Sequence, residues 1–301
     1  VRGLTSHDKG RTFSTILKSL HNLGYHVEYR LLNTSNFGVP QNRVRIYIIA
    51  SLEKEVTLTI PNDLGAKDTH NYKPSKGGHD FYTESKVSDI LEDSPDESYD
   101  CSDWFKQRLE DIFEGDLNKV HGIRLIDTRN GNSLHSWDLG LKGECSNDEI
   151  IFMNLLIANR RKHIFGTHQD GKALSKAQIE TFFKHSETTN IIKNLIKKGY
   201  LKEKNGLYNP VCGNMSFEVF KFLDPNKVSI TLTASDANRL GVYHNNRLRR
   251  LTPRECARLQ GYPDSYILHP KDSMAYKQLG NAVSVPVIKN IFLDIMKNNF
   301  I

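Results

Sequence analysis

The chain has 301 residues, 38% hydrophobic and 25% charged, which excludes a disordered polymer and fits one large or two ordinary folded domains. Its net charge of +6 favours a polyanionic partner over a cationic one. No run of 18 apolar residues occurs, so we expect no transmembrane helix and no membrane partner.

The chain start and the cysteines bear on compartment. The segment from Val1 to Leu4 lacks Met and the apolar core of a signal peptide, and we expect a piece of a longer polypeptide. The cysteines show no CxxC pair and no metal-ligand spacing, so we predict no metal site. We interpret them as reduced thiols of a cytoplasmic protein, with a disulfide pair as the alternative. They are Cys101, Cys145, Cys212 and Cys256.

The first 120 residues begin with an α/β pattern and then become irregular. Apolar residues at helical spacing predict a helix over 12–23, which Gly24 ends. Strand-like segments follow at 25–32 and 44–50, around a loop rich in turn formers. Residues 55–120 are polar, with one amphipathic helix expected over 103–113.

Residues 146–208 predict a helical segment followed by a hairpin. Ser146 and Glu149 have the spacing of a capping box at the start of a helix to about residue 161. A second capped start lies at 174–179, a third helical run at 191–201, and Asn205-Gly206 marks a tight turn. This order is the outline of a winged helix, and two packed surface helices with a hairpin are the alternative.

Three short blocks carry the residues most suited to chemistry. The first, 38–47, places Arg43 and Arg45 on one face of a strand entrance, where guanidinium groups can hold a base oxygen or a phosphate. Solvated arginines on an edge strand are the alternative. In the second block, 249–263, Thr252-Pro253 begins a helix that Gly261 ends. The third, 278–286, precedes a final apolar helix after Pro286.

In this order the blocks closely resemble those of the cytosine-C5 DNA methyltransferase family. Residues 1–4 are similar to the tail of its Glu-Asn-Val block, and 41–45 to its Gln-x-Arg-x-Arg block. Residues 251–263 resemble the block after the recognition region, and 278–283 the last block, Gln-x-Gly-Asn-Ser/Ala-Val. The resemblance covers about residues 1–50 and 230–301, and the middle corresponds to the family's variable target-recognition domain.

The resemblance implies an α/β fold, namely part of an S-adenosylmethionine-dependent, Rossmann-like methyltransferase sheet. An α+β target-recognition domain, winged-helix-like in part, would be inserted into it. We predict catalytic-domain residues at 1–53, a DNA-reading domain at 54–248, and closing motifs with the final helix at 249–301. The strands at 25–32 and 44–50 would pair antiparallel at the edge of the sheet.

The resemblance also implies a reaction and the residues that serve it. The family transfers methyl from S-adenosylmethionine to C5 of a cytosine flipped out of double-stranded DNA, after a cysteine thiolate has added to C6. We therefore predict a bacterial, nucleoid-associated restriction-modification enzyme. The predicted residues are Gln41, Arg43 and Arg45 for catalysis, Asn281, Ala282 and Val283 for the cofactor, and Arg247, Arg249, Arg250 and Arg254 for DNA. Basic stretches at 160–162 and 197–198 either contact DNA as well or form solvated faces.

The sequence departs from the family pattern at the nucleophile, because none of its cysteines follows a proline. The family's catalytic glutamate would precede Val1. We therefore expect a C-terminal half, inactive by itself, whose N-terminal catalytic half comes from the same polypeptide or a partner chain. Two alternatives stay open. A winged-helix protein without catalysis does not explain the three blocks, and RNA methyltransferases of the same superfamily usually have a compact recognition region.

Overall fold

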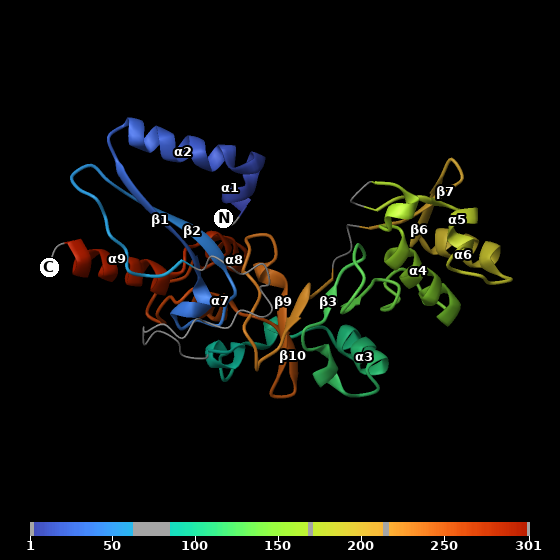
Figure 1. Ribbon diagram of the computed structural model, residues 1–301. Helices are drawn as coiled ribbons and strands as arrows, with labels where there is room; N and C mark the ends of the chain where they lie inside the picture. The colour runs from blue at the N-terminus through green and yellow to red at the C-terminus, as the bar shows by residue number, and fades with distance from the viewer. Residues whose placement is uncertain (1–2, 63–84, 168–170, 213–216, 300–301) are drawn as a thin grey trace. The chain divides into compact units, whose positions relative to one another are not determined.

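The computed structural model describes residues 3–62, 85–167, 171–212 and 217–299. The chain forms two compact units, coloured along the sequence in Figure 1. Unit 1 comprises Val1–Tyr99, Leu223–Asn238 and Leu251–Ile301, and unit 2 comprises Asp100–Phe222 and Arg239–Arg250. These bounds differ from the predicted boundaries at 54 and 248. The reason is local packing, since the Val87 amide donates to the Lys227 carbonyl at 2.9 Å and holds both segments in unit 1.

Unit 1 opens with the predicted helix and strand pair. The antiparallel register pairs His26 with Ser51 and Asn33 with Val44, which confirms the expected pair. The elements before the first gap are α1 Gly3–Ser6, the 3-10 turn η1 His7–Gly10, α2 Arg11–Asn22, β1 His26–Asn33, η2 Thr34–Phe37 and β2 Val44–Ser51. The others are η3 Val87–Ile90, η4 Glu97–Tyr99, α7 Pro253–Leu259, α8 Asp272–Asn281 and α9 Val285–Asn299.

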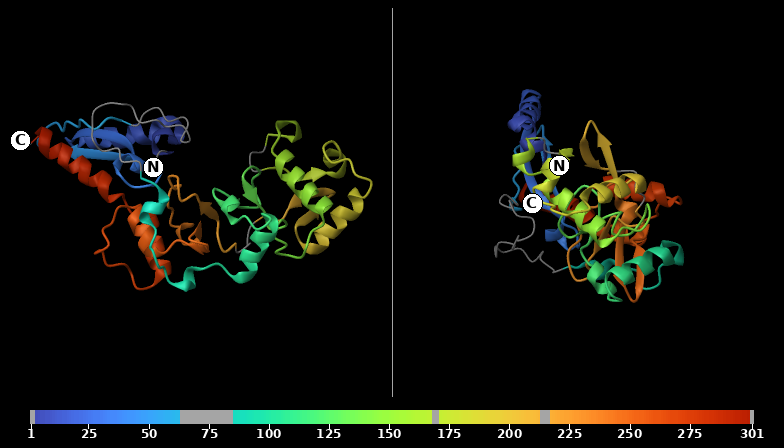
Figure 2. Two further views of the ribbon diagram at one scale, coloured as in Figure 1. Left: turned by 90° about the horizontal axis from the view of Figure 1, so that it is seen from below. Right: turned by 90° about the vertical axis from the view of Figure 1, so that its right-hand side faces the viewer.

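Helices cover both faces of the β1–β2 ribbon (Figures 1 and 2). Phe13 of α2 contacts Tyr29 of β1 edge to face, with ring centroids 5.0 Å apart. Leu32 of β1 packs instead in a buried cluster with Val287 and Ile291 of α9. Because successive strand residues point to opposite faces, Tyr29 and Leu32 place α2 and α9 on opposite sides. The result is an α/β/α arrangement.

The segment Asp272–Asn298 is long and apolar enough, by composition alone, to cross a membrane. It consists of two helices, because the backbone is extended at Ala282 between α8 and α9. Its residues Leu279, Val287 and Ile291 belong to the buried core of unit 1. We therefore assign this segment to the fold of unit 1.

Unit 2 is built on a five-stranded sheet and a three-stranded sheet, ordered β10-β9-β8-β3-β4 and β5-β7-β6 in the described residues. Its first elements are α3 Asp103–Ile112, η5 Leu117–Val120, β3 Arg124–Leu125, β4 Ser133–Leu134, α4 Asn147–Asn159, η6 His163–Phe165, β5 Leu174–Ser175 and α5 Lys176–Glu180. They are followed by α6 Thr188–Lys198, β6 Leu201–Lys204, β7 Leu207–Pro210, β8 Lys221–Leu223, β9 Leu240–His244 and β10 Arg247–Arg250. The last residue of β8, Leu223, belongs to unit 1, and the 3-10 turn η7 Ala237–Arg239 begins in unit 1 and ends in unit 2.

The second half of unit 2 matches the predicted order of helices and hairpin. Ser146 caps α4 in a capping box with Glu149, and Ser175 caps α5 in the same way. Asn205 and Gly206 have φ of 55° and 73°, as a type I′ hairpin turn requires. Strand β5 pairs with β7, so α4, β5, α5, α6 and the β6–β7 hairpin form one compact body.

Candidate functional site

Gln41 joins the first and second sequence blocks in the interior of unit 1. Its side chain is fully buried. The amide nitrogen donates to the Leu259 carbonyl at 2.7 Å, and the amide oxygen accepts from the Leu232 main-chain N–H at 2.9 Å. Both polar ends are therefore satisfied, and Gln41 fixes the turn before β2 against the end of α7.

Arg43 joins the first and third blocks. Only 5% of it is exposed, and its guanidinium donates to the carbonyls of Leu232 at 2.6 Å and Ala282 at 2.8 Å, with a longer contact to that of Gly280 at 3.4 Å. Burial lowers the pKa of Arg43 to about 10, and the charge of Arg45 adds to this lowering. A planar fork fits several carbonyls at once, so Arg43 clamps the connection between α8 and α9.

Gln260 and Gly261 complete the junction of the three blocks. The Gln260 amide nitrogen donates to the Leu279 carbonyl at 2.8 Å, and its main-chain carbonyl accepts from the Val285 N–H at 2.9 Å. Gly261 has φ +76°, and a Cβ there would lie 2.3 Å from the Pro286 ring. The close approach of Pro286 therefore requires glycine. The sequence analysis assigned no role to Gln260, although its position within the second block was a signal that could have singled it out.

Arg45 differs from the two buried residues beside it. It lies on β2 opposite Leu32, on the face that α9 covers. Among the described residues its guanidinium bonds only the neighbouring Val44 carbonyl, at 2.9 Å. Partial burial lowers the pKa of Arg45. The side chain is half-buried and keeps guanidinium donors that bond nothing else in the described chain.

Tyr47 follows on the same face of β2. Its hydroxyl is buried and has no hydrogen-bond partner among the described residues. Burial raises the pKa of Tyr47. A buried hydroxyl without a partner is costly, so this end of β2 is suited to meet a further polar group.

The predicted cofactor residues lie at the α8–α9 connection. Asn281 is the last residue of α8, and the final helix α9 begins four residues later at Val285. The Asn281 side chain is exposed, and no hydrogen bond joins it to the rest of the described chain. Val283 is 49% exposed, and the Ser284 hydroxyl is buried without a partner in the described structure. An amide, an apolar side chain and a free hydroxyl therefore lie within four residues.

All four cysteines are free thiols. Burial raises the pKa of each one, to about 12 for Cys101 and about 11 for Cys145. Cys256 is completely buried. A thiol with a raised pKa stays protonated at neutral pH, whereas the thiolate is the nucleophile. None of the four is suited to attack a base.

The arginines predicted to contact DNA differ in their surroundings. Within unit 2, Arg247 pairs with Asp100 at 2.8 Å, and Arg250 is half-buried. Arg249 is only 2% exposed, so its side chain does not reach the surface and is not available for the predicted DNA contact. Arg254, in unit 1, donates to the Tyr266 carbonyl at 2.9 Å.

The basic stretch at 160–162 is in part structural. Arg160 is 5% exposed and donates to the Asn209 side chain at 2.5 Å. Its guanidinium also donates to the Lys172 carbonyl at 3.3 Å. This side chain therefore links the end of α4 to β7, and its burial leaves it unavailable to contact DNA.

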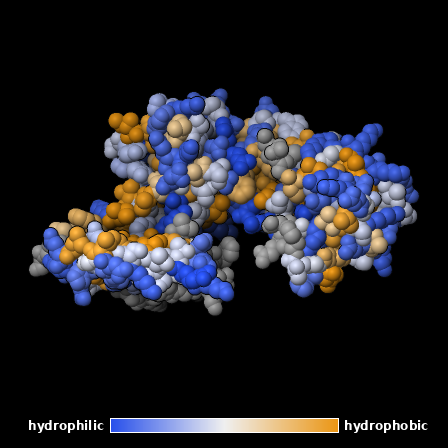
Figure 3. Space-filling view, turned by 90° about the horizontal axis from the view of Figure 1, so that it is seen from above, coloured by the Kyte–Doolittle hydropathy of each residue, from blue (hydrophilic) through white to orange (hydrophobic). Residues whose placement is uncertain are grey.

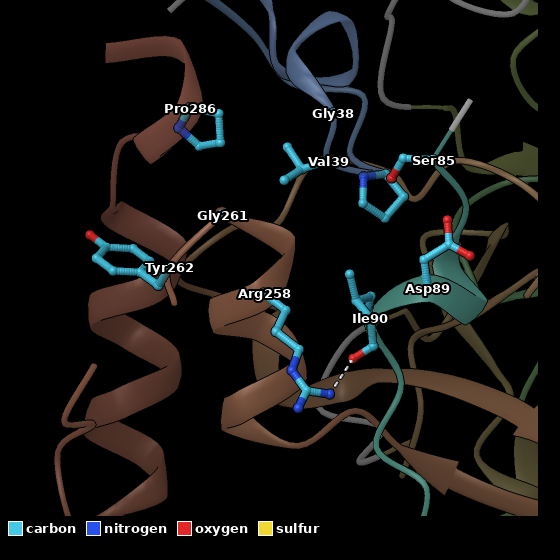
Figure 4. Close-up of a pocket in the computed structure, with 10 residues that line it drawn as sticks. Gly38, Val39, Ser85, Asp89, Ile90, Arg258, Gly261, Tyr262 and Pro286 are labelled. Carbon is cyan, nitrogen blue, oxygen red and sulfur yellow. Dashed lines mark hydrogen bonds between the residues drawn. The ribbon is translucent and has the colours of Figure 1, made fainter. Parts of the chain in front are cut away.

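A cavity of about 460 Å³ lies beside the junction in unit 1 (Figure 4). The turn at Gly38 and Val39, η3 and α7 surround it. Arg258 reaches its wall, where it donates to the Ile90 carbonyl at 3.2 Å and pairs with Asp264 at 2.8 Å. None of the predicted site residues lines the cavity, and the charge of Arg258 is already compensated by Asp264.

Comparison with known proteins assigns the family. Residues 1–297 match the family described as C-5 cytosine-specific DNA methylase. The type II methyltransferase M.BanI of Aneurinibacillus aneurinilyticus is 58% identical over 299 residues, which are 99% of this chain and 70% of that protein. M.HgiCI of Herpetosiphon aurantiacus is 59% identical, with 99% of this chain and 71% of that protein covered. M.NlaIV of Neisseria lactamica is 39% identical, with 97% and 70% covered.

Solved structures give a weaker likeness. The S. pombe Dnmt2 methyltransferase aligns with 98% of this chain and 63% of its own, at 16% identity and a TM-score of 0.39. The family match over nearly the whole chain and the curated relatives near 60% identity are decisive. They show that this chain belongs to the C-5 cytosine-specific DNA methylase family.

Proposed function

We propose that this chain carries the base-holding and DNA-reading parts of a type II cytosine-C5 methyltransferase acting on double-stranded DNA. The observation that supports it most is the junction of Gln41, Arg43 and Gln260. These buried side chains join the three sequence blocks through main-chain bonds and leave Arg45 partly exposed beside them. The family match favours this function over a non-catalytic winged-helix protein and over an RNA enzyme.

Arg45 is the residue we propose to act on the base. When a thiolate adds to C6 of a flipped cytosine, negative charge develops on the ring and its O2. A guanidinium held at that oxygen stabilises the charge as it forms. Gln41 and Arg43 act as positioning residues in this scheme, because their polar atoms are engaged within the protein.

The Asn281–Val283 segment is the part of the cofactor site that we assign to this chain. S-adenosylmethionine, which members of the family generally use, supplies the methyl group when bound. The exposed Asn281 amide and Val283 side chain fit a ligand with both polar and apolar parts, and the unpartnered Ser284 hydroxyl offers a further bond. Arg43 holds the Ala282 carbonyl and so sets the path of this segment.

The thiol nucleophile, in our proposal, comes from outside these 301 residues, on the same polypeptide or a partner chain. The state of the four thiols in this chain supports this, because burial raises their pKa values and keeps them protonated. Helix α9 also exposes large apolar side chains, with Phe292 at 61% and Leu293 at 53%. The unit 1 side of Figure 3, at left, shows several orange areas between blue ones. An exposed apolar face of this kind suits further packing.

Unit 2 is proposed as the target-recognition domain, with residues 147–210 as a winged helix. The supporting topology is helix, strand, two helices and a hairpin, with β5 paired to β7, which is the central strand of the three-stranded sheet. Arg247 and Arg250, on β10, are the proposed phosphate contacts in this unit, and Arg254 is the proposed contact in unit 1.

The test joins this chain to the part of the M.BanI protein that it does not match, and measures transfer of labelled methyl groups to mixed-sequence duplex DNA. We expect the fusion to be active and the 301-residue chain alone to give background only. Arg45→Ala should lower turnover at least about tenfold, roughly 1.4 kcal/mol in the barrier. The matched control is Arg11→Ala, because Arg11 is an exposed arginine of unit 1. Incorporation by the chain alone, or full turnover by Arg45→Ala, would contradict the proposal.

A further inference from the structure

Helix α6 and the hairpin after it present a basic surface that no catalytic residue occupies. Resting on the proposed function, which makes DNA the substrate, we propose that α6 enters the major groove of the target duplex and reads bases there. The β6–β7 hairpin would then contact the neighbouring phosphate backbone. We call these two elements the reading surface, defined by Thr188–Lys198 and Leu201–Pro210.

The two sides of α6 are chemically distinct. Its buried side consists of Thr188, Ile191, Ile192 and Leu195, and the three apolar residues belong to one core cluster with Phe152 of α4. Three and four residues apart, these positions share one face of the helix. The opposite face, from Thr189 to Lys197, therefore points away from the core of unit 2.

The exposed side of α6 carries groups that can recognise base edges. It carries no carboxylate. Its residues are Thr189, Asn190, Lys193, Asn194, Ile196 and Lys197. Asparagine pairs with adenine and lysine with guanine in the major groove, which is wide enough for a helix. In the described residues the side chains of Lys193, Asn194 and Lys197 have no hydrogen-bond or ion-pair partner. Their donors and acceptors are therefore available to a ligand.

Charge is concentrated in this part of the chain. Residues 174–210 contain seven lysines and three glutamates, a net charge of +4, against +6 for the whole chain. Helix α3, in the same unit, gives the contrast, because its exposed positions include Asp103 and Asp111. A duplex carries dense negative charge, so the positive surface of α6 is complementary to it and that of α3 is not.

The hairpin adds two lysines on one face. Lys202 and Lys204 are exposed and two residues apart on β6, so they point the same way. The single carboxylate between them, Glu203, accepts from the Gly206 N–H at 2.7 Å and closes the turn. The hairpin thus presents two lysine cations, while the carboxylate between them is bonded within the turn. This arrangement suits contact with phosphates.

The reading surface is rigidly supported. Lys198, at the end of α6, pairs with the buried Glu149 of α4 at 2.6 Å. Gly199 has φ +79° and ends the helix in the left-handed conformation. A helix fixed along one side and at one end can hold its other side in a groove with little loss of conformational entropy on binding.

The experiment uses the 301-residue chain and a fluorescent mixed-sequence duplex, with the dissociation constant measured over a series of salt concentrations. We expect the double variant Lys193→Ala, Lys197→Ala to raise Kd at least about tenfold and to flatten the salt slope by about 2. Lys202→Ala with Lys204→Ala should act in the same direction. The matched control removes two lysines elsewhere in unit 2, Lys106 and Lys119, and should bind as the wild type does. Circular dichroism checks that each variant is folded.

A second arm tests base reading. Duplexes selected from a random pool by the wild type and by Asn194→Ala should differ at specific positions, with the salt slope unchanged. Binding of Lys193→Ala, Lys197→Ala equal to that of the control, an unchanged selected site for Asn194→Ala, or a preference for RNA over duplex DNA overturns the inference. If the wild type binds and the fusion methylates DNA while these variants have no effect, the inference about α6 fails and the proposed function is retained. If the wild type binds no duplex, the proposed function fails too.

Discussion

Replacing Arg43 by alanine tests whether this arginine holds unit 1 together or acts on the substrate. The side chain is almost completely buried and donates to two carbonyls at 2.6 and 2.8 Å, from segments 189 and 239 residues away along the chain. Removal leaves these carbonyls without their donor, and nothing of similar size fills the space. We therefore expect a loss of stability rather than a pure loss of turnover.

The size of the loss follows from the bonds. A hydrogen bond to a charged group contributes about 1.5–3 kcal/mol, so two such bonds contribute roughly 3–6 kcal/mol. The cost of burying the charge, seen in the lowered pKa of Arg43, disappears in the variant and offsets part of this. We expect a net loss of about 3–5 kcal/mol, and with about 2–4 °C per kcal/mol a fall in Tm of roughly 10 °C.

Thermal and urea unfolding of the 301-residue chain measure this loss. Arg45→Ala is the matched control, because the Arg45 guanidinium bonds only the adjacent carbonyl in the described structure, and it should stay within about 1 kcal/mol of wild type. Arg43→Lys should fall between, since lysine keeps the charge without the planar fork. Equal losses for Arg43→Ala and Arg45→Ala would refute the division into a positioning and a catalytic arginine.

Three further predictions concern the cofactor segment, a helix contact and a buried acid. Asn281→Ala should weaken S-adenosylmethionine binding in calorimetric titration of the M.BanI fusion while duplex affinity stays unchanged; equal cofactor affinities would leave Asn281 a helix end only. Gly280→Ala should destabilise unit 1 by about 3 kcal/mol, because its Cβ would lie 2.3 Å from the main chain at Ala234, whereas Gly3→Ala meets nothing within 4 Å. Burial raises the pKa of Asp127 above its ordinary 3.8, so the folded state holds this proton more tightly and its contribution to stability falls as pH rises through that pKa. Asp127→Asn should therefore raise Tm at neutral pH and lose this advantage in acid, and a pH-independent difference would contradict the assignment.

Local signals in the sequence determined the secondary structure around the site. Helices α4 and α7 begin where the Ser146 capping box and the Thr252-Pro253 pair predicted them. In the structure both starts have a capping box, which satisfies main-chain donors within four residues. The Asn205-Gly206 turn and the β1–β2 pair likewise depend on neighbours close in the chain. The order of the three blocks also identified the family, because the order and spacing of motifs can be read directly from the sequence.

The tertiary structure alone decided which polar side chains are buried and what they hold. Gln41 and Arg43 stand in one motif with Arg45, yet they bond main-chain atoms about 190 to 240 residues away, while Arg45 stays partly exposed. Arg249 lies in a basic run that reads as a surface, but it is buried in unit 2. A sequence shows that an arginine is present, whereas its burial depends on which distant segments pack around it. Long-range packing therefore separates the arginine that holds the fold from the one left to meet a ligand.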